Sequence, residues 1–166
     1  VAAQDVVRFS KIRNTQHPFH IHVSEQKKEV NEALAHLNKR PVQWLLDNLE
    51  LDSTYHLVHA THLVKAELKG LAKSGANVVL CPSTEGNLGD GFFRLKEYIN
   101  QGGRWSIGTD SHIGLSPLEE LRILDYGQRL LNHERNTMAT EKEPDSGKMA
   151  IKTVLDNGQR AMGIPG

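Results

Sequence analysis

Short stretches rich in apolar residues, separated by polar and turn residues, predict β-strands over residues 18–24, 54–60, 76–81 and 104–109. Between and after these stretches, apolar residues recur at helical spacing. We expect helices over residues 1–13 (the end of a helix), 25–37, 41–49, 63–73, 92–100, 116–133 and 147–162. The polar segments 82–91 and 136–146 are expected to be loops.

The order of these elements predicts an α/β fold, because strands alternate with helices four times, as in parallel βα units. The run at 76–81 is almost wholly apolar, which is typical of a parallel strand covered on both faces. Four βα units are half of an eight-stranded barrel, and an isolated half leaves two sheet edges unpaired. We therefore expect residues 1–166 to be part of a longer protein, and the first residue, Val1, and the turn at 163–166 favour this interpretation.

Composition narrows the class of protein but not its chemistry. Of the 166 residues, 38% are hydrophobic and 24% are charged, which is ordinary for a globular domain. Twenty basic and twenty acidic residues balance, so we expect neither nucleic acid nor a membrane as a partner. No apolar run is long enough to span a bilayer, and no signal peptide is recognisable. Cys81 is the only cysteine, which excludes an internal disulfide and predicts a cytoplasmic protein.

Unusual polar residues fall at the predicted carboxyl ends of three strands, where parallel α/β folds gather ligands and catalytic groups. His22 ends the first strand with Glu25 three residues later, His59 ends the second strand, and Asp110 ends the fourth. Together these side chains can form one hydrolytic metal centre. We expect a metal ion there to acidify water, with Asp110 binding both metal and water. Glu25 would carry the proton to the leaving group, and His59 would polarise the substrate.

Each residue also has a purely structural interpretation, which its own surroundings in the sequence leave open. His22 can be satisfied by a backbone carbonyl, Glu25 can begin a helix, and Asp110 can cap a loop. His59, taken alone, is more often structural than functional. The segment 82–91 suits either substrate contact or a plain turn. The metal is not identified by these ligands, because zinc, iron and manganese all accept histidine and carboxylate.

The order and spacing of these residues resemble the amidohydrolase superfamily in its aminohydrolase (deaminase) branch. In that branch an HxxE motif ends strand five, a histidine ends strand six and an aspartate ends strand eight. Six longer segments are similar to the formimidoylglutamate deiminase family, the iminohydrolases of histidine degradation. These segments are HIHVSEQKKEV (20–30), RPVQWLLDN (40–48), LVHATHL (57–63), CPSTEGNLGDGFF (81–93), GTDSH (108–112) and EELRILDYGQRL (119–130).

The resemblance implies a metal-dependent (β/α)8 TIM barrel, with residues 1–166 forming strands five to eight of the catalytic domain and the upstream half-barrel absent from the sequence. It implies that N-formimidoyl-L-glutamate and water give N-formyl-L-glutamate and ammonia. Zinc would be bound by His22 and Asp110, whereas the strand-one HxH that supplies further ligands is not in this sequence. The implied catalytic residues are Glu25, His59 and Asp110, and the implied substrate contacts are His62, Glu85, Asn87 and Ser111.

Two further hypotheses stay open beside this one. The chain can belong to another deaminase or chlorohydrolase of the same superfamily, acting on guanine or a related aminoheterocycle. Alternatively, it can be a non-catalytic half-barrel that serves as an assembly or metal-binding module. Because part of the implied site is missing, we expect the 166-residue chain alone to be inactive. The longer protein is expected to act on a small molecule and to form a homo-oligomer.

Overall fold

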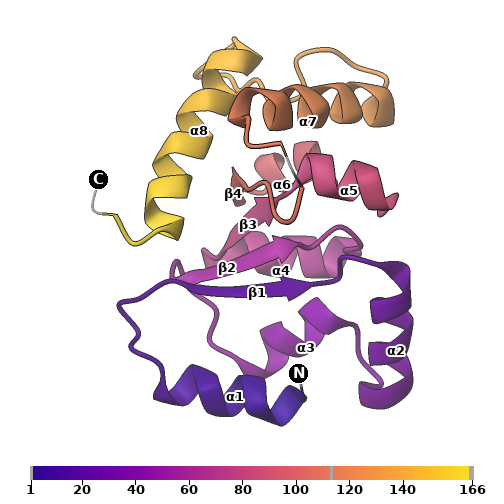
Figure 1. The fold of residues 1–166 in the computed structure, drawn as a ribbon, viewed down its shortest axis with the longest axis vertical. Coiled ribbons are helices and arrows are strands. Elements are labelled where there is room, and N and C mark those ends of the chain that lie inside the picture. Colours follow the sequence, from indigo (N-terminus) through magenta and orange to yellow (C-terminus); the bar gives the residue numbers. More distant parts are fainter. Residues whose placement is uncertain (1, 113, 165–166) are drawn as a thin grey trace.

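The computed structural model describes residues 2–112 and 114–164 (Figure 1). Its strands are β1 (Phe19–Val23), β2 (Tyr55–His59), β3 (Asn77–Leu80) and β4 (Arg104–Ile107). Its helices are α1 (Ala3–Ile12), α2 (Lys27–Leu37), α3 (Pro41–Asn48), α4 (Lys65–Ser74), α5 (Pro82–Leu88), α6 (Leu95–Asn100), α7 (Pro117–Asn132) and α8 (Ser146–Ala161). Val1 and residues 165–166 of the expected turn lie outside the described residues. Within them, no helix combines the length and the apolar character that crossing a membrane requires.

The four strands form one parallel sheet in the order β1-β2-β3-β4, which confirms the predicted α/β fold. Parallel neighbours need a crossover connection, and here every crossover contains at least one helix. The register places His22 opposite Val58 and places Val79 opposite Ser106. Because the strands are parallel, their carboxyl ends meet along one edge of the sheet.

Alternation along the strands gives the sheet two distinct faces. One face joins the main hydrophobic core through residues such as Leu57 and Val78, which pack with the surrounding helices. The other face carries a small separate cluster of Val58, Val79 and Cys81. Strands β2 and β3 are buried along their whole length, as expected for parallel strands covered on both faces.

A polar row crosses the second face, with one residue from each strand. The His20 ring stacks on the His56 ring at 4.6 Å between centroids. The side-chain nitrogen of Asn77 lies 3.2 Å from Nδ1 of His56 and donates a 2.8 Å hydrogen bond to Ser106 Oγ. His20 itself is exposed, and its Nε2 lies 2.8 Å from the backbone oxygen of Ala161. Burial, with the neighbouring His20, lowers the pKa of His56 to about 4.

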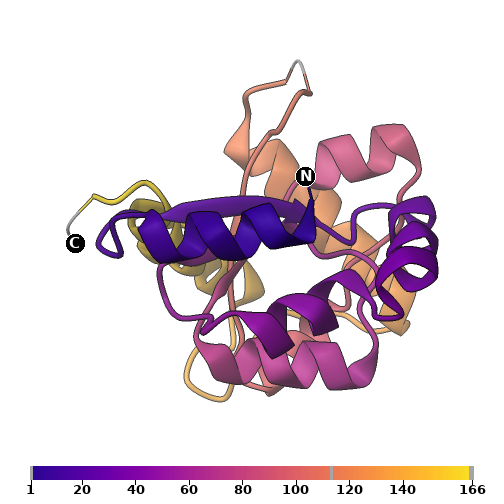
Figure 2. The same ribbon diagram turned by 90° about the horizontal axis from the view of Figure 1, so that it is seen from below.

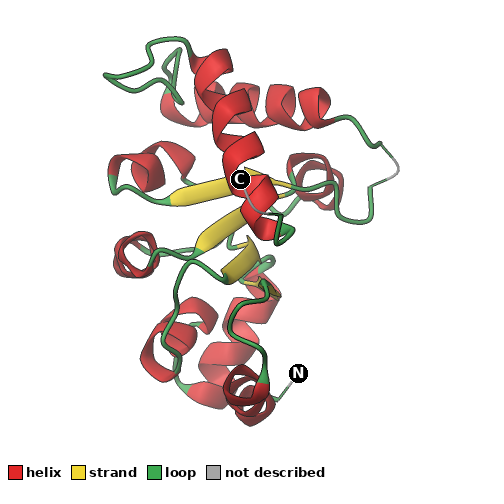
Figure 3. Cartoon of the chain, turned by 90° about the vertical axis from the view of Figure 1, so that its left-hand side faces the viewer, coloured by secondary structure: helices red, strands yellow, loops and turns green. Residues whose placement is uncertain are grey.

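The helices lie around the sheet and at both of its ends. Figure 1 places α1, α2 and α3 on the β1 side, with α7 and α8 at the opposite end. Helix α1 runs along β1, and Phe9 contacts Phe19 with ring centroids 5.6 Å apart (Figure 2). Helix α8 reaches β4, where the Asn157 side chain donates a 2.8 Å hydrogen bond to Trp105 O. Figure 3 shows the strands together at the centre of the molecule, with helices above and below them.

The segment 82–91 contains helix α5, so the expectation of a loop there is wrong. The helix begins at Pro82 and ends at Leu88, and the next residue, Gly89, has a φ of 72°, the left-handed conformation that glycine adopts readily. The glycine and asparagine inside the segment lower its helix propensity, which is why the sequence favours a loop. Tertiary structure overrides that preference, because the Glu120 carboxylate accepts a 2.8 Å hydrogen bond from the Ser83 nitrogen in the first turn.

The remaining elements lie within two residues of their expected bounds, except the helix expected at 92–100. That helix, α6, begins only at Leu95. Phe93, two residues before the helix, is 1% exposed. Its carbonyl oxygen accepts hydrogen bonds from the Leu95 nitrogen and from the Gln128 side chain. The hydrogen bond from Gln128 of α7 to the Phe93 carbonyl therefore keeps the first residues of the segment out of the helix.

Candidate metal centre

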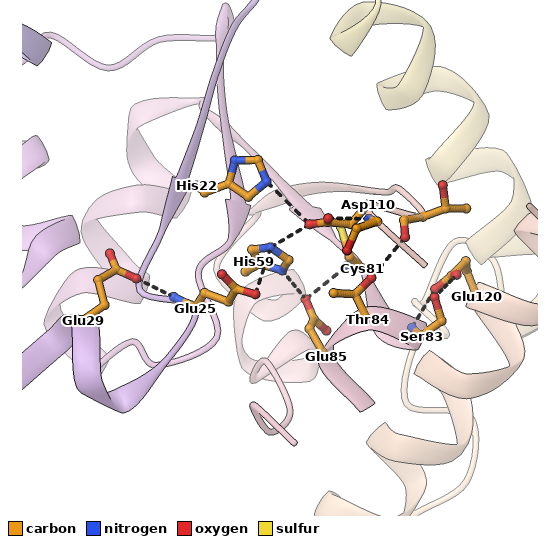
Figure 4. A network of polar contacts seen from close by, with 12 residues as sticks. His22, Glu25, Glu29, His59, Cys81, Ser83, Thr84, Glu85, Asp110 and Glu120 are labelled. Carbon is orange, nitrogen blue, oxygen red and sulfur yellow. Dashed lines mark hydrogen bonds and ion pairs between the residues drawn. The ribbon is translucent and has the colours of Figure 1, made fainter. Parts of the chain in front are cut away.

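The carboxyl ends of β1, β2 and β4 bring four predicted site residues together (Figure 4). His22 lies on β1 and Glu25 follows that strand, His59 is the last residue of β2, and Asp110 follows β4. The figure shows the His22, His59 and Glu25 side chains pointing toward the carboxylate of Asp110 or toward one another. The parallel sheet therefore supplies the convergence that the strand-end pattern predicts.

Left-handed backbone conformations mark the strand ends that form this cluster. The non-glycine residues concerned are Ser24 (φ 51°), His59 (φ 68°), Ala60 (φ 50°) and Asp110 (φ 52°). Such conformations cost on the order of 1–3 kcal/mol each and persist only where the surrounding structure enforces them. Regular alternation would place His59 on the same face as Leu57, away from His22. The left-handed backbone breaks that alternation, and the two imidazole rings lie 5.3 Å apart.

His22, His59 and Asp110 form a set that could hold a metal ion. One ligand atom from each lies within 4.8 Å of the others. Asp110 Oδ2 is 3.5 Å from His22 Nε2 and 3.1 Å from His59 Nε2. The His22 side chain is 63% exposed, whereas His59 is fully buried and Asp110 is 20% exposed. The cluster thus lies at the edge of the sheet, with one side open.

The chemistry of this set fits a divalent metal ion. Catalytic zinc sites use three protein ligands, and two imidazoles with one carboxylate are a common set. His59 Nε2 is buried and makes no hydrogen bond in the structure, although Asp110 Oδ2 lies 3.1 Å away. A buried polar atom without a hydrogen-bond partner is costly. A metal ion shared with Asp110 and His22 would satisfy that atom.

Glu25 lies beside this set and is suited to proton transfer. Its Oε1 is 3.6 Å from His59 Nε2. Burial raises the pKa of Glu25, and the charges of Asp90 and Asp110 add to this increase, against the opposing effect of the two histidines. The backbone position is fixed by Glu29, whose carboxylate accepts hydrogen bonds from the nitrogens of Ser24 (2.8 Å) and Glu25 (3.0 Å). A carboxyl whose pKa is raised toward neutrality can both accept and return a proton.

His59 and Asp110 each favour the charged form of the other. Burial alone would lower the pKa of His59, but the Glu85 hydrogen bond and the charges of Glu25, Glu85 and Asp110 outweigh it and raise the pKa. Burial alone would raise the pKa of Asp110, but the Ser111 hydrogen bonds and the two histidines outweigh it and lower the pKa. Asp110 is therefore held as a carboxylate, the form that binds a metal ion.

The residues predicted to contact substrate occupy different positions. His62 is half-buried, and its backbone nitrogen donates a 3.1 Å hydrogen bond to Ser24 O. Asn87, on α5, and Ser111, next to Asp110, are exposed. Glu85 is only 4% exposed and contacts His59 Nδ1, so it lies behind that imidazole. The physical reason is that α5 turns this side chain back toward the end of β2.

Two features of the site escape the sequence-based interpretation. The first is that His59 Nε2 lies with His22 and Asp110 in a single potential ligand set, because only the left-handed backbone at the end of β2 brings it there. The second is the pairing of Glu85 with His59. An acid placed four residues after the buried 76–81 strand was the available signal for this pairing, but its expected place in a loop concealed its direction.

Comparison with known proteins places this geometry in context. The sequence model of the amidohydrolase family matches residues 6–160. The chain is 47% identical over 148 residues to a formimidoylglutamate deiminase from Pseudomonas aeruginosa, covering 89% of this chain and 33% of that protein. It is 40% identical over 119 residues to 5-methylthioadenosine/S-adenosylhomocysteine deaminase 2 from Archaeoglobus fulgidus, covering 72% of this chain and 29% of that protein.

A solved structure agrees with the same assignment. The crystal structure of an amidohydrolase from Brucella melitensis superimposes with a TM-score of 0.94 at 40% identity. The match covers 99% of this chain and 36% of that chain. The chain therefore spans about a third of the length of the relatives it matches.

Proposed function

The chain belongs to the amidohydrolase family, and from that premise we propose that it supplies metal-binding and proton-transfer groups to a hydrolytic deaminase. The observation that carries the proposal is the set of His22, His59 and Asp110, whose ligand atoms lie within 4.8 Å of one another. Glu25 lies 3.6 Å from His59, within the same cluster. The whole protein is proposed to be a (β/α)8 barrel enzyme in which residues 1–166 form the second half of the catalytic domain.

Zinc is the metal we propose for this site, held by His22 and Asp110 and, in this chain, within reach of His59 Nε2. Its ligand set of imidazole and carboxylate supports zinc, while iron and manganese accept the same groups. When bound, the metal would act as a Lewis acid and lower the pKa of water. The residues of the chain then have to place the substrate and move protons.

Glu25 is the group proposed to carry protons. Its raised pKa and its place beside the cluster suit removal of a proton from the attacking water and delivery of that proton to the leaving nitrogen. The water oxygen forms a bond to the amidine carbon. Its remaining proton then passes to the same nitrogen as the carbon–nitrogen bond breaks and the C=O bond forms, so the nitrogen leaves as ammonia. His59 is proposed to hydrogen-bond the reacting centre through Nε2, and Asp110 to hold the metal and orient the water.

N-formimidoyl-L-glutamate is the substrate we propose for the whole protein, with N-formyl-L-glutamate and ammonia as products. The support is the 47% identity to the Pseudomonas aeruginosa formimidoylglutamate deiminase over 148 residues. His62, Asn87 and Ser111 are proposed to contact the substrate, since each follows a strand whose carboxyl end lies at the same edge of the sheet as the cluster. This reaction would place the protein in histidine degradation.

The experiment compares ammonia release by the 166-residue chain and by a longer protein that carries an upstream half-barrel before Val1. Both are assayed with added Zn²⁺ and a panel of substrates: N-formimidoyl-L-glutamate, simple amidines, guanine and 5-methylthioadenosine. We expect no turnover by the chain alone and preference for N-formimidoyl-L-glutamate in the longer protein. Preference for an aminoheterocycle would refute the proposed substrate, whereas turnover by the chain alone would refute the proposed division of the site.

Variants of the longer protein test the role of Glu25. Glu25→Gln removes the proton carrier and is expected to lower kcat by roughly 10²–10⁴-fold, the usual contribution of general acid–base catalysis. Glu32→Gln, on the exposed face of α2, changes the same chemical group away from the cluster and serves as the matched control. Equal activity of the two variants would remove Glu25 from the mechanism. Stable dimers of the chain, together with a longer protein that never turns over, would favour a non-catalytic assembly module.

A further inference from the structure

Glu85 is a buried carboxylate that the proposed reaction does not use directly. Its side chain is 4% exposed. Its Oε1 lies 3.2 Å from Nδ1 of His59 and accepts a 3.0 Å hydrogen bond from the backbone nitrogen of Cys81. A buried carboxylate is costly unless it is hydrogen-bonded or paired with a charge. These two contacts therefore fix both the carboxylate and the ring that faces it.

The chemistry of the contact determines which nitrogen of a neutral His59 ring carries the proton. An ionised carboxylate can only accept hydrogen bonds, and among the described residues only Nδ1 of the ring makes a hydrogen bond, to Glu85, whereas Nε2 makes none, so Nδ1 is the donor of a neutral ring. The second nitrogen, Nε2, is then left with a lone pair. That lone pair lies 3.1 Å from Asp110 Oδ2 and 3.6 Å from Glu25 Oε1, at the centre of the cluster. A lone pair in this place is what metal ligation or proton acceptance requires.

The helix that carries Glu85 is itself fixed between the strand ends. Ser83 donates hydrogen bonds from its nitrogen and its hydroxyl to Glu120 on α7. Thr84 Oγ1 donates a 3.1 Å hydrogen bond to the backbone oxygen of Thr109, the residue before Asp110. Three successive residues of α5 thus contact α7, the end of β4 and the end of β2 (Figure 4). A rigid support of this kind leaves the Glu85 carboxylate little freedom to turn away from His59.

We propose that Glu85 is a positioning residue, which locks His59 in the tautomer protonated on Nδ1 and directs the Nε2 lone pair into the metal centre. The effect of Glu85 on hydrolysis rests on the proposed function. The effect of Glu85 on the His59 tautomer does not depend on that function. The family resemblance implies a substrate contact for Glu85, and the present proposal gives the carboxylate a different role. The carboxylate acts through the imidazole and does not touch the reacting atoms.

A plain capping role is the competing explanation, because Glu85 also accepts the Cys81 N–H at the start of α5. Glu85→Leu and Glu85→Gln separate the two roles. One oxygen, Oε1, makes both contacts, so the amide oxygen of glutamine can still accept both the Cys81 N–H and the Nδ1–H of His59. Leucine accepts neither, and the proton of a neutral His59 ring is then favoured on Nε2, which faces the carboxylates of Asp110 and Glu25. A plain capping role predicts that Glu85→Leu loses stability with no change of tautomer.

The experiment is nitrogen-15 NMR of the histidine rings in the metal-free 166-residue chain, at a pH where the nitrogen shifts show a neutral ring. The His59 signals are assigned from their loss in His59→Gln. We expect protonated Nδ1 and unprotonated Nε2 in the native chain and in Glu85→Gln, and a reversal of the two signals in Glu85→Leu. Protonated Nε2 in the native chain would overturn the proposal even if the variant failed to fold.

Glu120→Gln is the matched control, because Glu120 is also a buried glutamate that accepts hydrogen bonds from the first turn of α5 and has no contact with His59. It is expected to leave the His59 tautomer unchanged, and an equal reversal in this variant would overturn the proposal. A second readout is the affinity of the chain for Co²⁺, expected to fall roughly 10–100-fold in Glu85→Leu. Failure of the longer protein to hydrolyse its substrate would refute the proposed function and leave the tautomer result standing.

Discussion

Asp110→Asn is the substitution that tests the metal centre most directly. Asp110 Oδ2 lies 3.1 Å from His59 Nε2 and 3.5 Å from His22 Nε2, so a single oxygen joins the two imidazoles. The substitution keeps the shape of the side chain and removes the only negative charge of the potential ligand set. The native chain should therefore gain stability from Zn²⁺, and the variant should lose most of that gain.

The magnitude follows from binding linkage. At a free Zn²⁺ concentration 100 times the dissociation constant, binding stabilises the native chain by about 2.7 kcal/mol. For a chain of 166 residues, each kcal/mol shifts Tm by about 2–4 °C, which gives a rise of about 5–11 °C. Loss of a residue that only hydrogen-bonds a metal ligand can weaken metal binding by roughly 100-fold. Loss of a ligand itself, as in Asp110→Asn, should weaken binding by at least as much. At the same Zn²⁺ concentration the variant then gains only about 0.4 kcal/mol, or about 1–2 °C.

The assay is thermal unfolding of both proteins with and without Zn²⁺, followed by circular dichroism. Asp156→Asn is the control, because Asp156 lies in an exposed ion pair with Lys152 on α8 and its loss changes the net charge by the same amount. The control should show the native rise in Tm. A full rise in Asp110→Asn, or no rise in the native chain at saturating Zn²⁺, would refute the assignment of these residues to a metal centre.

Three further predictions concern stability and are checked by urea unfolding. Glu67 is fully buried and binds Arg40 and two backbone nitrogens, so Glu67→Ala should cost about 3–5 kcal/mol. The exposed Glu32→Ala should cost less than about 0.5 kcal/mol, and equal losses would contradict the reasoning. Gly103→Ala places a Cβ against the buried ring of Tyr98 and should cost about 1–3 kcal/mol, while an unchanged midpoint would show that the ring can move. His56 has a pKa of about 4 in the fold and about 6.5 when unfolded, so the unfolded chain binds more protons between these values and stability falls as pH decreases from 6.5 to 4. That loss is about 3 kcal/mol, and a variant His56→Gln with the same pH dependence as the native chain would contradict it.

Most of the fold follows from patterns that are local in the sequence. Apolar periodicity predicts the strands and most helices to within two residues, because burial of one face or one stripe imposes that period on each element separately. The failures lie where a distant contact overrides local preference. Helix α5 forms although its segment contains glycine and asparagine, because Glu120 of α7 binds its first turn. Helix α6 begins late, because the Gln128 side chain of α7 donates a hydrogen bond to the Phe93 carbonyl oxygen.

The candidate site divides in the same way. The sequence by itself determined the types of side chain at the strand ends, and parallel strands required that His22, Glu25, His59 and Asp110 meet at one edge. Only the tertiary structure decided that the Nε2 atom of His59 joins the ligand set and that Glu85 lies behind its ring. These facts depend on left-handed backbone at the ends of β2 and β4 and on the direction of α5. Such conformations are enforced by contacts between segments far apart in the chain, so no local pattern of hydrophobic and polar residues could have predicted them.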